Sequence, residues 1–380
     1  MINISKLYCG LSGVSDELRY AHTPSTGPIV VYNCTPRCNL RCLHCYAASD
    51  STRQDTELTT KQAKKLLSDI VEVNAPVVLF SGGEPMLRPD LFELMAEAKR
   101  LGLRTVISTN GTLIDESAAK KLKDSDINYV GISIDGDEEF HDKFRRKEGS
   151  FAAAMAAYEN CRKAGLRTGL RFTVNSANKD QVPGVFDICQ AKGVRRVCFY
   201  HLIKSGRATL IKAESITTQK TRGVMDTILA KTDDFVRRGL LDEVLTVGNH
   251  ADGPYLLVKM MEQGKSIDQQ QKLLLANGGN RIGEGIACVG WDGSVYADQF
   301  WRNYSLGNVT QKSFKQIWTN EDEPVLNKLR NKTRFADKRC LKCRWFMLCK
   351  GNFRFLGDDP DIKNWLLEPP CYLTDAEIGL

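Results

Sequence analysis

The stretch that decides the fold reads Ile29-Val-Val-Tyr-Asn-Cys-Thr-Pro-Arg-Cys38-Asn-Leu-Arg-Cys42-Leu-His-Cys45. Its short apolar, β-branched beginning predicts a buried strand. The three cysteines that follow can hold an iron–sulfur cluster and leave one iron without a protein ligand. An open metal position of this kind is what catalysis requires. A zinc site completed by His44 and a set of unliganded thiols are the alternatives.

Outward from this stretch, apolar runs alternate with amphipathic segments as far as about residue 205. This alternation predicts βαβ units and a parallel sheet, so the fold class is α/β. Six units are too few for a closed eight-stranded barrel, which leaves an open, partial barrel or a doubly wound sheet. The expected strands are 29–32, 77–80, 105–108, 129–134, 169–174 and 194–200, and the expected helices lie near 60–73, 90–101, 115–123, 150–164 and 181–192.

Polar or glycine-rich residues stand at the end of each expected strand. In parallel α/β folds, sites assemble at the carboxyl ends of strands, so these residues are expected to face one site. After the three cysteines of the first strand, they are Ser81-Gly82-Gly83-Glu84-Pro85, Ser108-Thr109-Asn110-Gly111, Ser133-Ile134-Asp135-Gly136, Asn175 and His201.

A second group of cysteines closes the chain: Cys340-Leu-Lys-Cys343, then Cys349 and Cys371. Four thiolates can ligate a cluster completely, which predicts a closed site for electron transfer or structure. On spacing alone, structural zinc is the alternative. The six remaining cysteines, which stand apart, are read as buried structural thiols: Cys9, Cys34, Cys161, Cys189, Cys198 and Cys288.

The pattern divides the chain of 380 residues into four parts. We expect an N-terminal extension over 1–27, the barrel over 28–210, a helical connector over 211–285 and a cysteine-rich domain over 286–380. The last part should open with a hairpin over 287–300 that turns at Asp292-Gly293, followed by a helix near 313–330.

The net charge of +7 is mild, and the 53 Lys and Arg residues are scattered among 46 acidic ones. The sequence contains no long basic block of the kind that would predict a nucleic-acid partner. A basic pocket would, however, suit an anionic small molecule. No apolar run approaches the roughly 20 residues that span a bilayer. The opening residues are too polar for a signal peptide, so no membrane association and a cytoplasmic location are expected.

The pattern CxxxCxxC after a first strand, with GGEP after a second, resembles the radical S-adenosylmethionine (SAM) superfamily. The resemblance implies a partial (β/α)6 TIM-like barrel over about 28–210. It also implies a [4Fe–4S] cluster on Cys38, Cys42 and Cys45. That cluster would bind SAM and cleave it to a 5′-deoxyadenosyl radical, with electrons from a donor such as a ferredoxin or flavodoxin.

The same resemblance assigns cofactor contacts to residues at the strand ends. Arg171 would lie near the methionine carboxylate, or else be a surface arginine, and Tyr46 would pack near adenine or in the core. His201 would approach the substrate or donate a proton as a catalytic residue, or else be a structural histidine. The methionine amino end would meet Gly82, Gly83 and Glu84, and the ribose or the substrate would meet Ser108, Asn110, Ser133 and Asp135.

The tail resembles the SPASM extension of these enzymes, which favours iron–sulfur over zinc for Cys340, Cys343, Cys349 and Cys371. The full SPASM pattern has seven cysteines for two auxiliary clusters. In this chain Cys288 matches the first of them, but Asp298 and Phe353 stand where two others belong. We therefore expect one auxiliary cluster, two [4Fe–4S] clusters in total, and a free Cys288, with Asp298 as a possible oxygen ligand.

The strings 4–10, 15–20, 349–354 and 370–375 resemble the haem-biosynthesis branch of the superfamily, and most closely its iron-coproporphyrin III synthases. The resemblance implies removal of acetate side chains from an iron tetrapyrrole, 12,18-didecarboxysiroheme. Arginines suit its carboxylates, and Arg19, Arg302 and Arg354 are candidates by position. The alternatives are propionate removal in haem d1 formation, a peptide-modifying maturase, and a non-enzymatic zinc scaffold.

Overall fold

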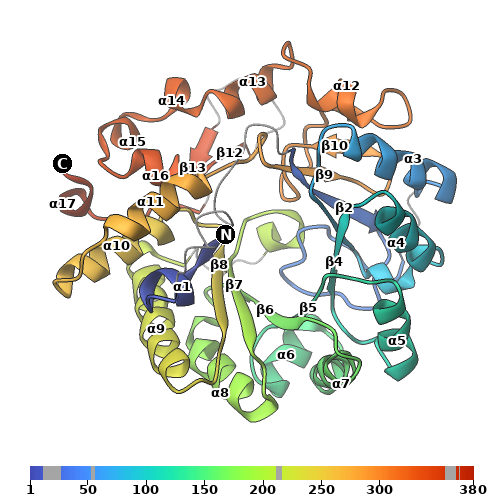
Figure 1. Ribbon diagram of the computed structural model, residues 1–380, viewed down its shortest axis with the longest axis horizontal. Coiled ribbons are helices and arrows are strands. Elements are labelled where there is room, and N and C mark those ends of the chain that lie inside the picture. Colours follow the sequence, from blue (N-terminus) through green and yellow to red (C-terminus); the bar gives the residue numbers. More distant parts are fainter. Residues whose placement is uncertain (12–26, 53–55, 211–215, 356–364, 368) are drawn as a thin grey trace.

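The computed structural model describes residues 1–11, 27–52, 56–210, 216–355, 365–367 and 369–380 (Figure 1). Its centre is an 11-stranded sheet in the order β1-β8-β7-β6-β5-β4-β3-β2-β9-β10-β11. The strands β2 to β8 pair in parallel, one after the next, and curl into a partial barrel (Figure 1). These strands are β2 (Ile29–Thr35), β3 (Val77–Gly82), β4 (Arg104–Thr109), β5 (Tyr129–Ile134), β6 (Thr168–Val174), β7 (Arg196–His201) and β8 (Glu243–Val247).

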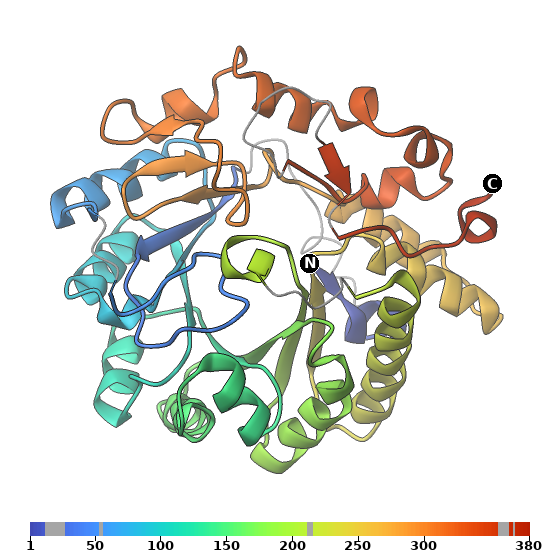
Figure 2. The same ribbon diagram turned by 180° about the vertical axis from the view of Figure 1, so that it is seen from behind.

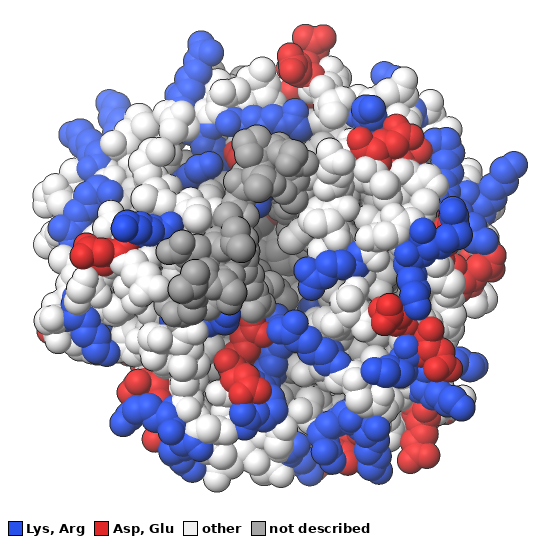
Figure 3. Space-filling view, viewed as in Figure 1, with Lys and Arg blue, Asp and Glu red and all other residues white. Residues whose placement is uncertain are grey.

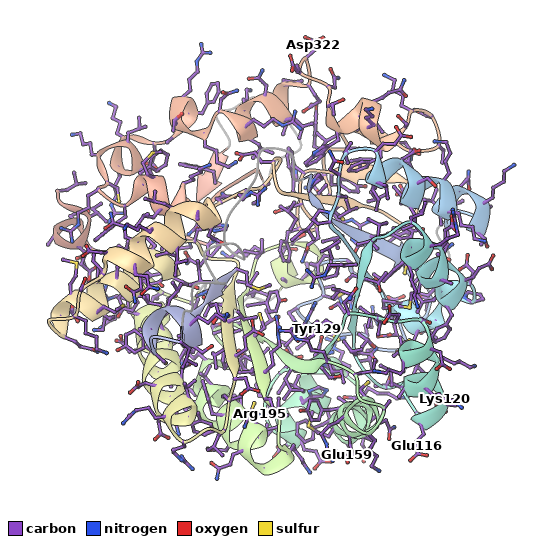
Figure 4. All side chains as sticks on the ribbon, viewed as in Figure 1. Glu116, Lys120, Tyr129, Glu159, Arg195 and Asp322 are labelled. Carbon is purple, nitrogen blue, oxygen red and sulfur yellow. The ribbon has the colours of Figure 1, made fainter. Side chains whose placement is uncertain are left out.

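Helices cover the outside of this barrel. A capping box between Thr59 and Gln62 starts the first of them, and the Asp115 side chain caps the third. Glu116, Lys120 and Glu159 extend outward from these helices, whereas Tyr129 lies inside the ring of strands (Figure 4). The covering helices are α3 (Thr60–Val71), α4 (Leu91–Arg100), α5 (Glu116–Asp124), α6 (Glu138–Arg145), α7 (Ser150–Lys163), α8 (Val182–Lys192) and α9 (Thr218–Arg237).

The two faces of the barrel strands differ in chemistry because successive side chains point to opposite sides. Large apolar side chains face the helices; Phe199 of β7, for example, stacks on Phe186 of α8 with ring centroids 5.5 Å apart. Residues on the opposite face, such as Asn33 and Ser81, are polar and line the interior. A polar interior leaves the barrel free to hold a polar ligand.

The segment expected as a helical connector contains a strand. β8 pairs in parallel with β7, so the parallel series continues past the six predicted strands. Its sequence, EVLTV, is short and begins with a charged residue, which hides it from a periodicity argument. The segment also holds α10 (Asp252–Glu262) and α11 (Asp268–Asn277), and the residue-scale boundaries of the four predicted parts stay a prediction.

Four further strands flank β2 to β8 in the sheet, and three of them are joined to it only by antiparallel pairing. β1 (Ile2–Asn3), which leads into α1 (Ile4–Tyr8), pairs with β8 at one edge. At the other edge β9 (Ile286–Val289) runs parallel to β2 and forms the predicted hairpin with β10 (Ser294–Tyr296), which pairs in turn with β11 (Gly307–Asn308).

The rest of the C-terminal part is built from short elements. The single helix expected near 313–330 is two helices, because Pro324 starts a new one. None of the helices in the described residues is long and apolar enough to cross a membrane. The elements are α12 (Phe314–Trp318), α13 (Pro324–Arg330), α14 (Lys332–Phe335), α15 (Lys338–Lys342), α16 (Phe346–Cys349), β12 (Phe353–Phe355), β13 (Trp365–Leu367) and α17 (Asp375–Ile378), and the 3-10 helices along the chain are η1 (Pro85–Leu87), η2 (Lys179–Gln181) and η3 (Gly206–Leu210).

Candidate functional site

The three clustered cysteines lie on the cysteine loop, residues 36–50, at the mouth of the barrel (Figure 2). Cys38 and Cys42 are buried and share an apolar cluster with Leu40, against which Cys45 packs. The end of α6 holds the loop on one side, where the Leu43 N–H donates to the Phe144 carbonyl at 3.1 Å. The structure thus brings the three predicted thiols together on one supported loop.

A second clamp on the cysteine loop comes from η3. The Arg207 guanidinium donates to the carbonyls of Cys42 and Ser49, each at 2.8 Å. A Cβ on Gly206 would lie 2.3 Å from the Tyr46 carbonyl oxygen, so only glycine permits this approach. Neither residue was singled out from the sequence, because the contact joins segments about 160 residues apart.

The environment of the thiols suits a buried cluster. Burial, and next the nearby Glu84, raises the pKa of Cys38 to about 12, and burial raises that of Cys42 to about 12 against the opposing effect of Arg145. The Leu40 N–H donates to Cys38 Sγ at 3.4 Å. Ligation deprotonates such thiols, and N–H donors to sulfur stabilise the resulting thiolates. The donor set therefore fits an iron–sulfur cluster.

The glycine-rich loop after β3 lies directly on the cysteine loop. The Gly83 N–H donates to the Thr35 carbonyl and the Glu84 N–H to the Arg37 carbonyl, each at 2.8 Å. A Cβ on Gly83 would lie 2.0 Å from the Arg37 oxygen, and Gly82 has a φ of 125° that favours glycine. These glycines allow the backbone of the loop to reach the cluster side of the barrel.

Glu84 is completely buried and joins β3 to β4. Its carboxylate accepts hydrogen bonds from Thr109 Oγ1 at 2.7 Å, the Asn110 N–H at 2.8 Å and the Met86 N–H at 3.1 Å. Burial raises its pKa, against these three donors. The carboxylate thus holds the loop in shape, and its contact with the methionine amino group stays a prediction.

The end of β4 is also tied to the cysteine loop. Asn110 donates from Nδ2 to Asn39 Oδ1 at 2.9 Å, and the same nitrogen lies 3.8 Å from Cys38 Sγ. Ser108 and Ser133 are half-buried on β4 and β5. Their predicted contacts with ribose or substrate remain predictions.

Asp135 belongs to a buried polar network behind the cysteine loop. Its carboxylate accepts from Arg145 Nε at 2.7 Å, and His44 Nε2 lies 3.5 Å from its other oxygen. Its backbone N–H donates to His141 Nδ1 at 3.2 Å. Despite burial, Arg145 keeps the pKa of Asp135 lowered. Arg145 is therefore the partner of Asp135, which sequence reasoning missed. The contact of Asp135 with ribose stays a prediction.

Arg171 and Tyr46 both lie in the barrel interior. The Arg171 guanidinium lies between the rings of Tyr129 and Tyr200, 5.8 and 5.9 Å from their centroids. A Cβ on Gly131 would lie 2.1 Å from Arg171 Nε, so this glycine makes room for the side chain. Arg171 is therefore not a surface arginine, and its contact with the methionine carboxylate stays a prediction.

Tyr46 joins the cysteine loop to the interior of the sheet. Its hydroxyl donates to Asn33 Oδ1 at 2.8 Å and lies 3.1 Å from Ser81 Oγ. Its ring meets Phe300 edge-on, with centroids 5.4 Å apart. The tyrosine therefore contacts β2, β3 and the C-terminal part together, while its contact with adenine remains a prediction.

His201, at the end of β7, is buried in a network that leads away from the cysteine loop. Its Nε2 lies 3.0 Å from Asp252 Oδ2, and Asp252 Oδ1 accepts from the Tyr372 hydroxyl at 2.7 Å. Asp252 starts α10, and Tyr372 follows Cys371 in the sequence. The pairing gives His201 a structural role, and a catalytic role for it stays a prediction.

The four C-terminal cysteines line one cavity. The Trp345 N–H donates to Cys343 Sγ at 3.4 Å and the Gly351 N–H to Cys349 Sγ at 3.3 Å. Burial raises the pKa of Cys349 to about 12. Within the described residues, neither these cysteines nor those of the cysteine loop form a group of three side chains placed to hold a single metal ion, as a zinc site would need. Four thiols around one cavity, with N–H donors to sulfur, fit a fully ligated cluster.

Cys288, which matches the first SPASM cysteine, and Asp298, which stands where another belongs, are both buried. Cys288 Sγ accepts from Asn33 Nδ2 at 3.4 Å, and burial raises its pKa to about 12. Asp298 Oδ1 accepts from the Phe300 and Trp301 N–H groups at 2.9 and 2.8 Å. Of the three arginine candidates, Arg19 and the side chain of Arg354 lie outside the described residues.

Comparison with known proteins places two family models on the chain. Residues 32–187 match the radical SAM superfamily, and residues 281–344 match SPASM, an iron–sulfur cluster-binding domain. The first match contains Cys38, Cys42, Cys45 and the glycine-rich loop. The second contains Cys288, Cys340 and Cys343 but ends before Cys349 and Cys371.

Curated relatives match the chain over nearly its whole length. It is 44% identical to Fe-coproporphyrin III synthase of Methanosarcina barkeri, covering 100% of this chain and 99% of the relative. It is 37% identical to pre-heme d1 synthase of Dinoroseobacter shibae, covering 97% and 93%. Both matches therefore extend over nearly the full length of the two chains compared.

Solved structures share the fold at low sequence identity. SuiB of Streptococcus suis bound to its precursor peptide SuiA superposes with a TM-score of 0.71 at 17% identity, over 92% of this chain and 76% of that one. Native anSMEcpe with bound AdoMet gives 0.64 at 22% identity, over 85% and 88%. These matches bear on the fold alone.

Proposed function

Because the chain belongs to the radical SAM superfamily and carries an iron–sulfur SPASM domain, we propose that it is an iron-coproporphyrin III synthase. Its reaction removes the acetate side chains of 12,18-didecarboxysiroheme, in the siroheme-dependent route to haem. One observation carries the proposal: the 44% identity to the Methanosarcina barkeri enzyme extends over the full length of both chains.

In this proposal Cys38, Cys42 and Cys45 hold the catalytic [4Fe–4S] cluster. That cluster supplies the electron that cleaves SAM to a 5′-deoxyadenosyl radical. Arg207 and the end of α6 keep the loop in position, and Gly82 and Gly83 bring a backbone edge beside it. Arg171 faces the methionine carboxylate as a permanent cation, and the barrel walls exclude water from the radical.

We assign the four C-terminal cysteines to a second, fully ligated [4Fe–4S] cluster, which makes two in all. The cavity that they share and the N–H donors to Cys343 and Cys349 support this assignment. A cluster that is fully ligated by cysteines suits electron transfer. Such a role is needed because removal of the side chains requires the transfer of electrons. A ferredoxin or flavodoxin would supply the reducing electron from outside the chain.

The second candidate is the propionate chemistry of haem d1 formation, favoured by the 37% identity to pre-heme d1 synthase. It needs the same cofactors and another iron tetrapyrrole. A peptide-modifying activity has weaker support. PqqA peptide cyclase of Gluconobacter oxydans is 30% identical over only 61% of this chain, and the solved structures at 17–22% identity show the fold alone.

The test is anaerobic reconstitution followed by turnover. The purified protein should contain about eight irons per chain, as two [4Fe–4S] clusters require. With SAM, a reductant and 12,18-didecarboxysiroheme, mass spectrometry should find iron-coproporphyrin III together with 5′-deoxyadenosine. SAM cleavage with an unchanged tetrapyrrole mass would contradict the proposed substrate, and a colourless zinc protein would contradict radical chemistry altogether.

Two cysteine variants separate the clusters. Cys42→Ala should abolish SAM cleavage, whereas Cys349→Ala should lose about half of the iron and keep an electron paramagnetic resonance signal that responds to SAM. Cys189→Ala, a buried thiol on α8, is the matched control and should keep all the iron. Loss of all the iron in either variant, or loss of the SAM-responsive signal in Cys349→Ala, would contradict the assignment of two separate sites.

A further inference from the structure

An open cleft of about 1180 Å³, its mouth included, lies between the cysteine loop, η3 and the β9–β10 hairpin. Its walls include Tyr46 beside the last cysteine of the loop, Gly206 of η3, and Trp291, Tyr296 and Arg302 of the C-terminal part. The cleft is large enough for a ligand of cofactor size, and its mainly polar lining combines three aromatic rings with the charged side chains of Asp292 and Arg302. We call it the Arg302 cleft.

Arg302 is a fixed cation in this wall. Its guanidinium lies 3.8 Å from the centroid of the Trp291 ring and 5.6 Å from that of Tyr296. Stacking of this kind holds the planar group in one orientation and leaves its N–H edge available. The side chain is therefore preorganised, and a ligand that binds it loses little conformational entropy.

The N–H edge of Arg302 has an unfilled donor. Within the part of the chain that the structure describes, its Nη1 is buried and has no hydrogen-bond partner. Asp292 lines the same cleft, but its two oxygens accept from the N–H and the hydroxyl of Ser294. A buried donor without an acceptor costs free energy, which an incoming carboxylate would recover.

The Arg302 cleft adjoins the site of radical formation. Tyr46 lines the cleft with its ring and reaches Asn33 and Ser81 in the barrel interior with its hydroxyl. The ring also meets Phe300, two residues before Arg302. A ligand in the Arg302 cleft would therefore be separated from the polar barrel interior by the side chain of Tyr46.

We propose that Arg302, stacked on Trp291, binds a carboxylate side chain of the substrate and so orients the macrocycle against the barrel mouth. This inference rests on the proposed function, because it takes the ligand to be a planar tetrapyrrole with several carboxylates. A bidentate guanidinium–carboxylate contact fixes both position and rotation. It would therefore decide which side chains are turned toward the interior.

The test is a titration of the reconstituted enzyme with iron-coproporphyrin III, followed by its visible absorbance. Arg302→Gln should raise the Kd about 10- to 100-fold, the expected effect of removing a charged hydrogen bond. Arg302→Lys keeps the charge without the fork and should raise it less. Arg334→Gln, which removes an exposed arginine that contacts the Phe335 ring, is the matched control and should leave the Kd unchanged.

The outcomes separate this inference from the proposed function. Raised Kd values in the Arg302 variants, with SAM affinity and iron content as in the parent, support the inference. An unchanged Kd in Arg302→Gln, while the parent enzyme converts the substrate, overturns the inference alone. A parent enzyme that neither binds nor converts the tetrapyrrole overturns the proposed function. If Arg302→Gln does not fold, an unchanged Kd in Arg302→Lys overturns the inference.

Discussion

At the scale of single residues, the glycine-rich motif acts through its backbone as much as through side-chain chemistry. Gly83 lies where any Cβ would clash with the Arg37 carbonyl, and that carbonyl is fixed by its hydrogen bond from the Glu84 N–H. The atoms that a Cβ on Gly83 would meet belong to the backbone, so no flexible side chain could move aside to make room for it. The motif is thus a steric requirement of the fold as well as a proposed cofactor contact.

Gly83→Ala should lower the free energy of unfolding by about 3 kcal/mol, because the new methyl group forces the two loops apart. Gly223→Ala is the matched control; its Cβ meets nothing within 4 Å inside α9. It should stabilise the protein by about 0.5–1 kcal/mol through helix propensity. Urea unfolding of the cluster-free protein measures both values, and equal effects of the two substitutions would contradict the steric argument.

Glu84→Gln tests the buried carboxylate. Each carboxylate oxygen accepts from a backbone N–H, so the amide NH₂ of glutamine would face an N–H donor whichever way it is turned. We expect a loss of about 2 kcal/mol. Glu159→Gln, in a partly exposed pair with Arg162, should change stability by less than about 0.5 kcal/mol. A similar small effect at Glu84 would mean that its hydrogen bonds are dispensable.

At the scale of elements, α6 shows what sequence reasoning could reach. The strands, the five helices and the cysteine loop were predictable, because hydrophobic period, caps and motif spacing are local signals. α6 follows Asp137, a good N-cap, but is only eight residues long and has just two large apolar residues, Phe140 and Phe144. Its contribution, the Arg145–Asp135 pair and the carbonyls that meet the cysteine loop, depends on tertiary contact.

Arg145→Met should destabilise the cluster-free protein by about 3–5 kcal/mol, because it leaves Asp135 buried without its cation. The cysteine loop should also lose its support from α6, so the reconstituted variant should release iron faster to a chelator. Arg100→Met, in an exposed pair with Glu97, is the control and should cost less than about 1 kcal/mol. Equal iron release in the two variants would argue against α6 as the support.

At the scale of the whole molecule, polar contacts join the C-terminal tail to the barrel. Arg222 of α9 pairs with Glu377 of α17 through two hydrogen bonds of 2.8 Å, and Tyr372 reaches Asp252 and through it His201. Asp252 is 51 residues from His201 and 120 from Tyr372. Separations of this kind leave no local pattern, which is why the sequence predicted the cysteines but not what holds them in place.

The Glu377 contact predicts an acid-sensitive tail. The hydrogen bonds from Arg222 lower the pKa of Glu377 to about 2. A lowered pKa in the folded state means that the pair stabilises the protein fully above the usual value of 4.5, and that this stabilisation is lost as the pH falls toward 2. Glu377→Gln should therefore cost about 1–2 kcal/mol at pH 7, allowing for partial exposure, and progressively less below pH 4.5.

Urea unfolding of the cluster-free protein between pH 7 and pH 3 measures this difference. Glu116→Gln, exposed on α5, is the control and should track the parent protein at every pH. The face in Figure 3 carries Lys and Arg interleaved with Asp and Glu, so general charge effects act on both variants alike. A gap between Glu377→Gln and the parent that does not narrow with acid would contradict the assigned pairing.

The two sets of cysteines differ in how much of the chain must be folded before each exists as a set. Cys38, Cys42 and Cys45 share one short loop, so their spacing is set once β2 and α6 meet. Cys371 joins the other three only after the tail has returned to the segment just before α10, where Asn352 donates to Asn249 Oδ1 and to the Pro369 carbonyl. Contacts between segments far apart in the sequence form slowly during folding, and weakly held terminal segments open before the core does. Maturation of the proposed enzyme would therefore follow an order in time, with the radical-forming cluster inserted early and the helper cluster last in and first lost.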